Sequence, residues 1–431
     1  MPFDRFEKAI CDKKLYKTIG KVTQIIGLTI QVEGIKSFIG ESCEIVVGDN
    51  EKVLAEVVGF KGEISLLMPL GELTGIGPGS LVYPLGHSLT IKVGKGLLGK
   101  IVDGLGKPIS GEFIELEETV SIYQKPPNPL TRNPIENIMA TGVRSIDGML
   151  TCGEGQRLGI FAGSGIGKST LMGKISRSSD ADVNVIALIG ERNRELLNVI
   201  NKDLGEEGLK KSVVLIATSD QPALIRSKGA FVATAIAEHF RDQGLKVMFM
   251  MDSVTRFAMA EREIGLAIGE PPASKGYTPS VFARLPKLLE RSGTSEKGSI
   301  TAFYTVLVEG DDMNEPITDA VRGILDGHIV LSRKLAGKNH FPAIDVQSSI
   351  SRLMKQITCE EQYNIAAKIR DNLAVYEESE DLINVGAYVK GSNPRIDEAV
   401  KVHDSILEFL QQNNEDISTF EETLNMMKNI F

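Results

Sequence analysis

The fold is decided by the stretch Arg157-Leu158-Gly159-Ile160-Phe161-Ala162-Gly163-Ser164-Gly165-Ile166-Gly167-Lys168-Ser169-Thr170. An apolar run suited to a buried strand enters a loop of closely spaced glycines, and a Lys-Ser-Thr sequence then opens a helical pattern. This order is typical of a phosphate-binding P-loop, in which backbone N–H groups and a helix N-terminus surround an anion. An ordinary glycine-rich turn is the alternative, and the flanking strand and helix disfavour it.

The positions of this loop have separate expected roles. Lys168 is expected to reach the outer phosphates, and the Ser169 hydroxyl is expected to be a ligand for Mg²⁺. Ala162 stands where the usual pattern has glycine, and alanine tolerates most backbone conformations except those with positive φ. The sequence therefore predicts that ATP with Mg²⁺ binds at Ala162, Gly163, Ser164, Gly165, Ile166, Gly167, Lys168, Ser169 and Thr170.

Length and composition limit the class of protein. The 431 residues exceed one ordinary core, so two or three domains are expected. The net charge of -9 argues against a protein built chiefly to coat nucleic acid. The four cysteines lie far apart and form no CxxC pair, which predicts neither a zinc site nor a disulfide framework and fits a reducing cytoplasm. We expect no signal peptide and no membrane span, because no run of 18 apolar residues occurs.

The character of the sequence changes along the chain and predicts four parts. Residues 1–18 place Phe3, Phe6 and Ile10 on one side of an amphipathic helix. Residues 19–90 contain short β-type runs separated by turn residues, which predict a small closed β-barrel. Residues 91–359 hold the P-loop, and within them the glycine-rich segment 94–108 is expected to be a hinge. Residues 360–431 lack strand signals and are expected to be a helical domain.

Strand-like and helical stretches alternate after Gly142, which predicts a mostly parallel sheet covered on both faces. One long helix is expected over Pro222–Gln243, and three helices follow near the C-terminus, over Glu360–Asn372, Tyr376–Asn384 and Ile396–Gln412. The expected strands are Leu158–Phe161, Val183–Ile189, Val213–Ala217, Val247–Met251, Ile300–Val308 and His328–Leu331.

Two acidic residues follow predicted strands and are candidates for hydrolysis chemistry. Asp252 ends an apolar strand and is expected to hold Mg²⁺; the alternative is a helix N-cap before Ser253. Because Ser253 stands where many P-loop ATPases carry the catalytic acid, the base must lie elsewhere. Glu191 follows a strand and a glycine at the same sheet edge, so we assign it to polarising the attacking water. Arg192 is assigned to orienting the acids around metal and phosphate.

Together these motifs make the chain resemble the flagellar and injectisome type III export ATPases, relatives of the catalytic subunit of rotary ATP synthases. The resemblance covers nearly everything from about Gly20 to Ala399. Its most specific parts are the P-loop, Gly190-Glu191-Arg192-Asn193-Arg194-Glu195, the run from Asp252 to Pro272, and Gly276-Tyr277-Thr278-Pro279-Ser280-Val281-Phe282.

The resemblance implies an α/β fold with a RecA-like P-loop NTPase core, an N-terminal small β-barrel and a C-terminal helical domain. It also implies a homohexameric ring with nucleotide between subunits. Arg352 would then be the arginine finger that reaches a neighbour's γ-phosphate, and Arg256 matches an arginine near the phosphates. Phe341 matches the aromatic position that stacks on adenine, and Tyr388 is a further candidate for that pocket.

The function implied by the resemblance is that of an ATP-hydrolysing motor, with flagellar service favoured, that unfolds export substrates and delivers them to a membrane-embedded gate. The implied partners are a stator-like negative regulator at the N-terminus, a central stalk protein, the export gate and chaperone-substrate complexes. No nucleic acid is expected, and the implied location is cytoplasmic, with peripheral association at the inner face of the plasma membrane. The alternatives are a rotary synthase catalytic subunit, a non-catalytic nucleotide-holding subunit and a ring-shaped RNA translocase.

Overall fold

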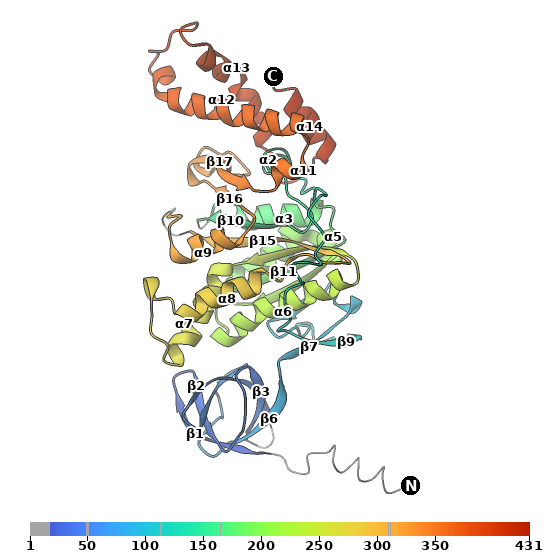
Figure 1. Cartoon of the computed structure of the whole chain (residues 1–431), viewed down its shortest axis with the longest axis vertical. Helices are drawn as coiled ribbons and strands as arrows, with labels where there is room; N and C mark the ends of the chain where they lie inside the picture. The colour runs from blue at the N-terminus through green and yellow to red at the C-terminus, as the bar shows by residue number, and fades with distance from the viewer. Residues whose placement is uncertain (1–17, 49–50, 113, 164, 309, 311) are drawn as a thin grey trace.

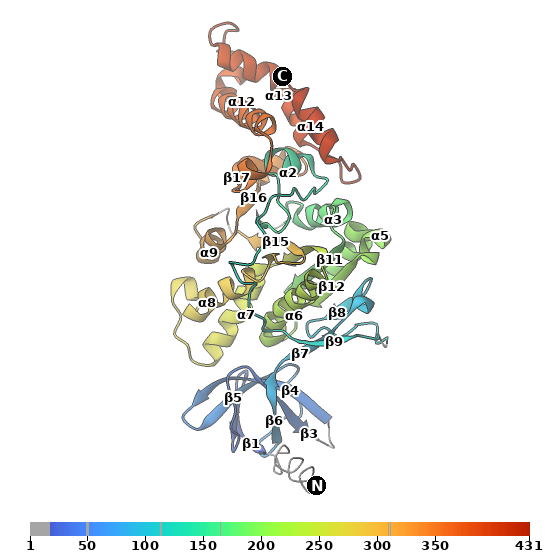
Figure 2. The ribbon, with the colours of Figure 1, turned by 45° about the vertical axis from the view of Figure 1, so that its right-hand side comes forward.

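The computed structural model describes residues 18–48, 51–112, 114–163, 165–308, 310 and 312–431. Figures 1 and 2 show a β-barrel at one end of the molecule, a group of helices at the other end and an α/β domain between them. The amphipathic helix predicted over residues 1–18, with Phe3, Phe6 and Ile10, lies almost wholly outside the described residues. No helix in the described ranges is long and apolar enough to cross a membrane.

The barrel is built from antiparallel strands whose alternate side chains point inward. Ile30, Val32, Ile45 and Val57 are among its buried residues. Its strands close in the order β1 (Gly20–Ile26), β2 (Thr29–Glu33), β5 (Ile64–Pro69), β4 (Glu51–Lys61), β3 (Glu41–Val47) and β6 (Leu81–Ser88).

The α/β domain contains a single mixed sheet in which most neighbouring strands run parallel. The edge strand β17 (Ile344–Ser351) pairs antiparallel with β16 (Gly327–Leu331). A short strand, β14 (Gly293–Thr294), pairs antiparallel with one end of β15 (Ser299–Leu307). Across the sheet the strands follow the order β17 (Ile344–Ser351), β16 (Gly327–Leu331), β10 (Arg157–Ala162), β15 (Ser299–Leu307), β13 (Lys246–Asp252), β11 (Val183–Ile189), β12 (Ser212–Ala217) and β8 (Ile101–Asp103).

Both faces of this sheet are covered, so its strands are apolar on both sides, as expected for parallel strands. Alternate residues of β11 belong to two different hydrophobic clusters: Val185 and Ala187 to one, Ile186 and Leu188 to the other. One cluster contains the long α6 (Ala223–Asp242) with α7 (Val254–Ala267), α8 (Pro279–Leu289) and α9 (Pro316–Ile324). The other contains α2 (Arg144–Met149) and α3 (Lys168–Ser178).

Smaller elements connect these layers. The strands β7 (Thr90–Val93) and β9 (Glu118–Ser121) pair antiparallel beside the barrel. Fully buried Lys228 of α6 lies 2.6 Å from Glu56 of the barrel, so a buried ion pair joins the barrel to the α/β domain. The remaining short α-helices of this domain are α4 (Asn193–Asn198), α5 (Gly205–Lys210), α10 (Arg333–Gly337) and α11 (Met354–Ile357), and a π-helix, η2 (Val199–Leu204), joins α4 to α5.

The C-terminal part consists of α12 (Glu360–Asn384), α13 (Pro394–Leu410) and α14 (Phe420–Lys428). Val402, Ile406, Phe409 and Met427 share a buried cluster with the P-loop helix α3. The C-terminal helices contact α2 and the edge strand β17. Figure 2 shows them beyond α2 and α3, at the end of the molecule opposite the barrel.

Every strand predicted from Val183 to Leu331 is present, and the long helix matches α6. One local prediction was wrong, and two strands were not predicted. The segment 94–108, predicted to be a hinge, also contains β8, which pairs with β12. The two helices expected over Glu360–Asn372 and Tyr376–Asn384 are one continuous helix. The strand β17 was not foreseen.

Candidate nucleotide-hydrolysis site

The P-loop joins β10 to α3, as its sequence requires. The strand β10 ends at Ala162 and α3 begins at Lys168. Gly165 and Gly167 have φ of 79° and 90°, a left-handed conformation that glycine adopts without strain. Any other residue at Gly165 or Gly167 would strain the backbone of the loop. Ser164 lies outside the described residues.

Lys168 lies between the two predicted acids. Its Nζ donates to Asp252 Oδ1 and lies 3.8 Å from Glu191 Oε1. Asp252 ends β13 and Glu191 follows β11, so neighbouring parallel strands bring both carboxylates to the P-loop edge of the sheet. The N-cap of α7 is Ser253, whose Oγ accepts from the Arg256 N–H at 3.3 Å. Asp252 is thus free of the capping role that was its alternative.

The environment of Glu191 suits a proton acceptor. Burial, together with the nearby charge of Asp252, raises the pKa of Glu191 from its usual 4.5 to about 7, against the opposing effect of Lys168 and Arg256. A carboxyl with a pKa near the operating pH is well matched to accept a proton from water.

Gly190 makes this placement of Glu191 possible. Its φ is 71°, and a Cβ at this position would lie 2.7 Å from the Arg256 Cβ. Only glycine fits such a close approach at positive φ without strain. Arg256 is thereby held beside Glu191, and its Nε is a buried donor without a hydrogen-bond partner among the described residues.

The oxygen donors near the P-loop fit Mg²⁺. Ser169 and Asp252 line the same small cavity, and hydroxyl and carboxylate oxygens are the ligands that Mg²⁺ prefers. No group of three His, Cys, Asp or Glu side chains suited to a metal occurs among the described residues. A magnesium ion here would therefore complete its shell with phosphate oxygens and water, as is usual for nucleotide sites.

A separate cavity of about 220 Å³ lies beside the P-loop and suits a nucleobase. It is lined by Ile166, Gly167, Leu171 and Phe341 among others. A Cβ on Gly167 would lie 3.8 Å from the Phe341 ring, so this aromatic side chain stands over the turn that leads into α3. An exposed aromatic face beside a phosphate site offers a stacking surface for a planar base.

Two predicted residues lie away from this cluster. Arg192 precedes α4, is largely exposed, and pairs with Glu195 at 3.5 Å instead of with Glu191 or Asp252. The Tyr388 hydroxyl lies in the loop between α12 and α13 and donates to Asn393 O at 3.0 Å and Asp397 Oδ1 at 2.9 Å. It does not line the cavity that contains Phe341.

Arg352 lies at the end of the strands that is opposite the P-loop. Ile344, at the start of β17, pairs with Leu331, which also pairs with Ala162. Ser351, at the other end of β17, pairs with Gly327. Asp326 accepts hydrogen bonds from both the Arg352 N–H and the Arg157 N–H, so the exposed Arg352 lies level with the first residue of β10. From there to Ala162, the last residue before the P-loop, β10 spans about 17 Å at 3.3 Å per residue. Arg352 therefore cannot reach Lys168 of its own subunit.

Comparison with known proteins agrees with this architecture. Residues 142–351 match the model of the ATP synthase alpha/beta family, nucleotide-binding domain, and residues 22–86 match the β-barrel domain of that family. Residues 358–429 match the T3SS EscN ATPase C-terminal domain. The flagellum-specific ATP synthase of Bacillus subtilis (strain 168) is 58% identical over 412 residues, which are 95% of this chain and 94% of that protein. The chain belongs to the type III export ATPases.

Other relatives and solved structures agree. The type 3 secretion system ATPase of Xanthomonas euvesicatoria is 49% identical, over 98% of this chain and 96% of that protein. The structure of the assembled ATPase EscN from the enteropathogenic E. coli type III secretion system matches with a TM-score of 0.91 and 47% identity, over 95% of this chain and 99% of that one. The expectations of the fold and of an ATP-hydrolysing enzyme are thus confirmed for this export ATPase.

Three residues of the site in this export ATPase were missed from its sequence. Thr305 of β15 donates to Asp252 Oδ1 at 2.8 Å and so orients that carboxylate. Gln412 and Asn414, which follow α13, line the cavity beside Phe341, and the Gln412 N–H donates to Phe341 O at 2.8 Å. A polar residue inside the apolar strand Ile300–Val308 was a signal for Thr305. The other two follow a helix without any motif, and nothing in the sequence pointed to them.

Proposed function

We propose that this export ATPase hydrolyses ATP with Mg²⁺ at sites shared between neighbouring subunits of a homohexameric ring. The observation that carries the proposal is the separation of Lys168 and Arg352, which lie at opposite ends of the strands of one sheet. In a head-to-tail ring, different surfaces of neighbouring subunits meet. Arg352 of one subunit could then lie at the P-loop of the next. The assembled state named for the similar EscN structure supports this arrangement.

The residues of the site divide the work between binding and hydrolysis. Backbone N–H groups of the P-loop and Lys168 would hold the phosphates, while Ser169 and Asp252 would hold Mg²⁺, which when bound neutralises charge on the phosphate oxygens. Glu191 would accept a proton from the attacking water, and Arg256 would contact the phosphates. Arg352 of the adjacent subunit would stabilise the charge that develops on the γ-phosphate.

The work done with this hydrolysis is the unfolding of export substrates and their delivery to an export gate. A role in flagellar export is favoured, because the sequence identity to the flagellum-specific relative (58%) is higher than the identity to the type 3 secretion relative (49%). A central stalk protein is a proposed partner, supported by the EscN structure in complex with its central stalk EscO. A regulator bound at the N-terminus and chaperone-substrate complexes are the other proposed partners, with peripheral association at the cytoplasmic face of the plasma membrane.

The competing functions have less support. A rotary synthase catalytic subunit shares the core, but the C-terminal 72-residue span from 358 to 429 matches the export group. A non-catalytic subunit would not need a partly buried carboxyl beside Lys168, and Glu191 supplies one.

The proposal is tested in the cells that make this chain by replacing it with the Glu191→Gln variant. Export of filament or injectisome components into the medium should stop while the variant protein is still produced. Glu195→Gln, on the same segment but exposed, is the matched control and should support normal export. Loss of filaments with an intact injectisome would assign flagellar service, and undiminished export by Glu191→Gln would refute the proposal.

A further inference from the structure

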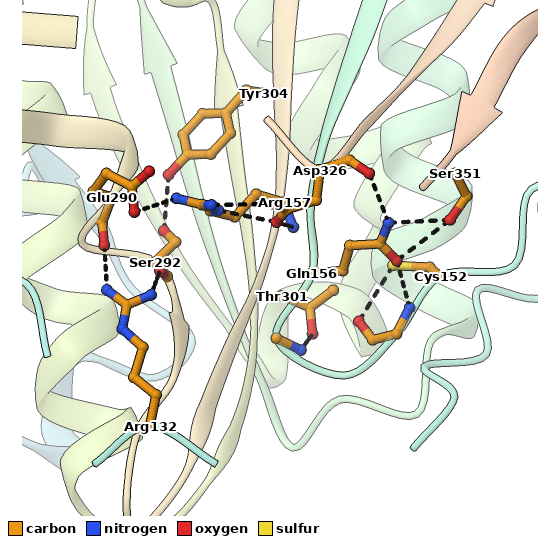
Figure 3. A network of polar contacts seen from close by, with 12 residues as sticks. Arg132, Cys152, Gln156, Arg157, Glu290, Ser292, Thr301, Tyr304, Asp326 and Ser351 are labelled. Atoms are coloured by element: carbon orange, nitrogen blue, oxygen red, sulfur yellow. Dashed lines mark hydrogen bonds and ion pairs between the residues drawn. The ribbon is translucent and has the colours of Figure 1, made fainter. Parts of the chain in front are cut away.

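A polar network occupies the end of β10 that is opposite the P-loop, and the roles assigned above do not use it. Figure 3 shows Arg157, which begins β10, reaching Asp326 and Glu290. The Arg157 backbone N–H and Nε each donate to Asp326 Oδ2 at 3.0 Å, and Nη2 donates to Oδ1 at 3.1 Å. Glu290 Oε2 lies 2.7 Å from Arg157 Nη1. Paired, parallel bonds of this kind fix both position and orientation, so Asp326 is held firmly against β10.

Asp326 in turn holds the backbone of Arg352. The Arg352 N–H donates to Asp326 O at 3.1 Å. Gln156 Nε2 donates to the same carbonyl at 3.2 Å and to Ser351 Oγ at 3.0 Å, as Figure 3 shows. Ser351 Oγ donates to Thr151 O at 2.8 Å. Gln156 is completely buried. Its side-chain amide joins the Asp326 carbonyl, which accepts from the Arg352 N–H, to the hydroxyl of Ser351, the residue before Arg352.

We propose that Gln156 is a positioning residue for Arg352, and that it acts on the hydrolysis site of the neighbouring subunit and not on its own. This inference rests on the proposed function, in which Arg352 serves the neighbour. A finger arginine contributes about 10³–10⁵-fold to turnover, and a displacement of about 1 Å costs on the order of 10²-fold. Loss of a side chain that fixes the backbone of Arg352 should therefore remove a large part of the effect of Arg352 on turnover.

The same geometry gives β10 two roles. The strand has six residues; Gln156 precedes it at one end and the P-loop follows it at the other. The strand β10 thus connects the P-loop of a subunit's own site to the residues that position Arg352 for the neighbouring site.

The test begins with Gln156→Met, which keeps the length of the side chain and removes its donor. We expect turnover to fall by about 10- to 100-fold, as for a displaced catalytic group, while KM and the affinity for a fluorescent ATP analogue stay at parental values. Gln362→Met is the matched control, because Gln362 is also buried and its Nε2 donates to Thr151 Oγ1 at 2.9 Å without touching Asp326 or Arg352. The control should hydrolyse ATP at the parental rate.

Mixed assemblies then decide on which subunit Gln156 acts. Mixing Gln156→Met with Lys168→Ala should raise turnover, because the Lys168→Ala subunit supplies a well-placed finger to an intact P-loop. Mixing Gln156→Met with Arg352→Ala should give no rise, because neither subunit then supplies such a finger. If Gln156 instead maintains its own P-loop, the two results are reversed, and that reversal overturns the proposal.

Two further comparisons separate the possible failures. The mixture of Arg352→Ala with Lys168→Ala tests the shared site by itself, so its rescue alongside the reversed Gln156 pattern would leave the proposed function standing. If Gln156→Met does not fold, Ser351→Ala removes the hydroxyl on the other side of the same contact and should show the same pattern of rescue. Parental turnover by a folded Gln156→Met or Ser351→Ala protein would also overturn the proposal.

Discussion

Replacement of Glu191 by Gln tests both the chemistry and the electrostatics of the site. The variant keeps the shape of the side chain and loses the group that accepts a proton. At about pH 8, turnover should fall by about 10²- to 10⁴-fold, the usual contribution of a positioned general base. ATP binding should remain, because Lys168 and the P-loop backbone are unchanged.

The pH dependence follows from the raised pKa of Glu191, from 4.5 to about 7. Below about pH 7 the free enzyme carries a protonated Glu191, so kcat/KM of the parent should rise about tenfold per pH unit and level off above this pKa. Stability changes in the opposite direction. Because the folded pKa is the higher one, the folded state binds more protons than the unfolded chain between about pH 4.5 and about pH 7, so stability is lost as pH rises through this window.

The size of this loss is about 3 kcal/mol, because the pKa of Glu191 rises from 4.5 to about 7 on folding and each pH unit between the two values contributes about 1.4 kcal/mol. The amide that replaces the carboxyl carries no charge to bury, so Glu191→Gln should become more stable than the parent by up to this amount as pH rises from about 5 to about 8. Steady-state kinetics and thermal unfolding across this pH range provide the assay, with Glu195→Gln as the exposed control. Parental turnover by Glu191→Gln, or a stability difference that does not change with pH, would refute the reasoning.

Three other changes test separate parts of the site. Lys168→Ala should abolish ATP binding, measured with a fluorescent ATP analogue. The variant loses the positive charge that would attract the phosphates and leaves the carboxylates of Glu191 and Asp252 unopposed; retained affinity would contradict the role of Lys168. Phe341→Ala should weaken that binding by about 1–3 kcal/mol, the value of one base-stacking contact, with unchanged affinity for inorganic triphosphate as the control, and equal losses for both ligands would argue against stacking. Removal of residues 1–15 should keep the thermal stability and basal ATPase activity but prevent co-purification with the proposed regulator, whereas a large drop in melting temperature would show that this segment is structural.

Much of the fold could be predicted because buried parallel strands are continuous apolar runs. Val183–Ile189 is buried along its whole length in the structure, and its sequence showed this directly. The edge strand Ile344–Ser351 was missed because four of its eight residues are at least partly exposed and the polar run Gln347-Ser348-Ser349 masks the alternation. The three-residue β8 is too short to give a signal among glycines.

The acidic residues of the candidate site could be predicted because Asp252 ends a strand and Glu191 lies two residues after one, and the carboxyl ends of parallel strands lie together. Glu191 and Asp252 lie beside Lys168 for this reason. Arg192 follows Glu191 by one residue, yet the chain turns there into α4 and its side chain meets Glu195. The surroundings of Phe341 depend on a loop about 70 residues later, and no local pattern predicts which side chains such a loop presents.

The central claim, that each hydrolysis site is completed by the neighbouring subunit, is tested most directly by mixing two inactive proteins. Arg352→Ala and Lys168→Ala, purified separately and combined in equal amounts, should regain ATP hydrolysis. In a randomly mixed head-to-tail ring, about one quarter of the interfaces join an intact P-loop to an intact finger, so recovery of up to about this fraction of parental turnover is expected. Absence of any recovery, with both proteins shown to assemble together, would contradict the account.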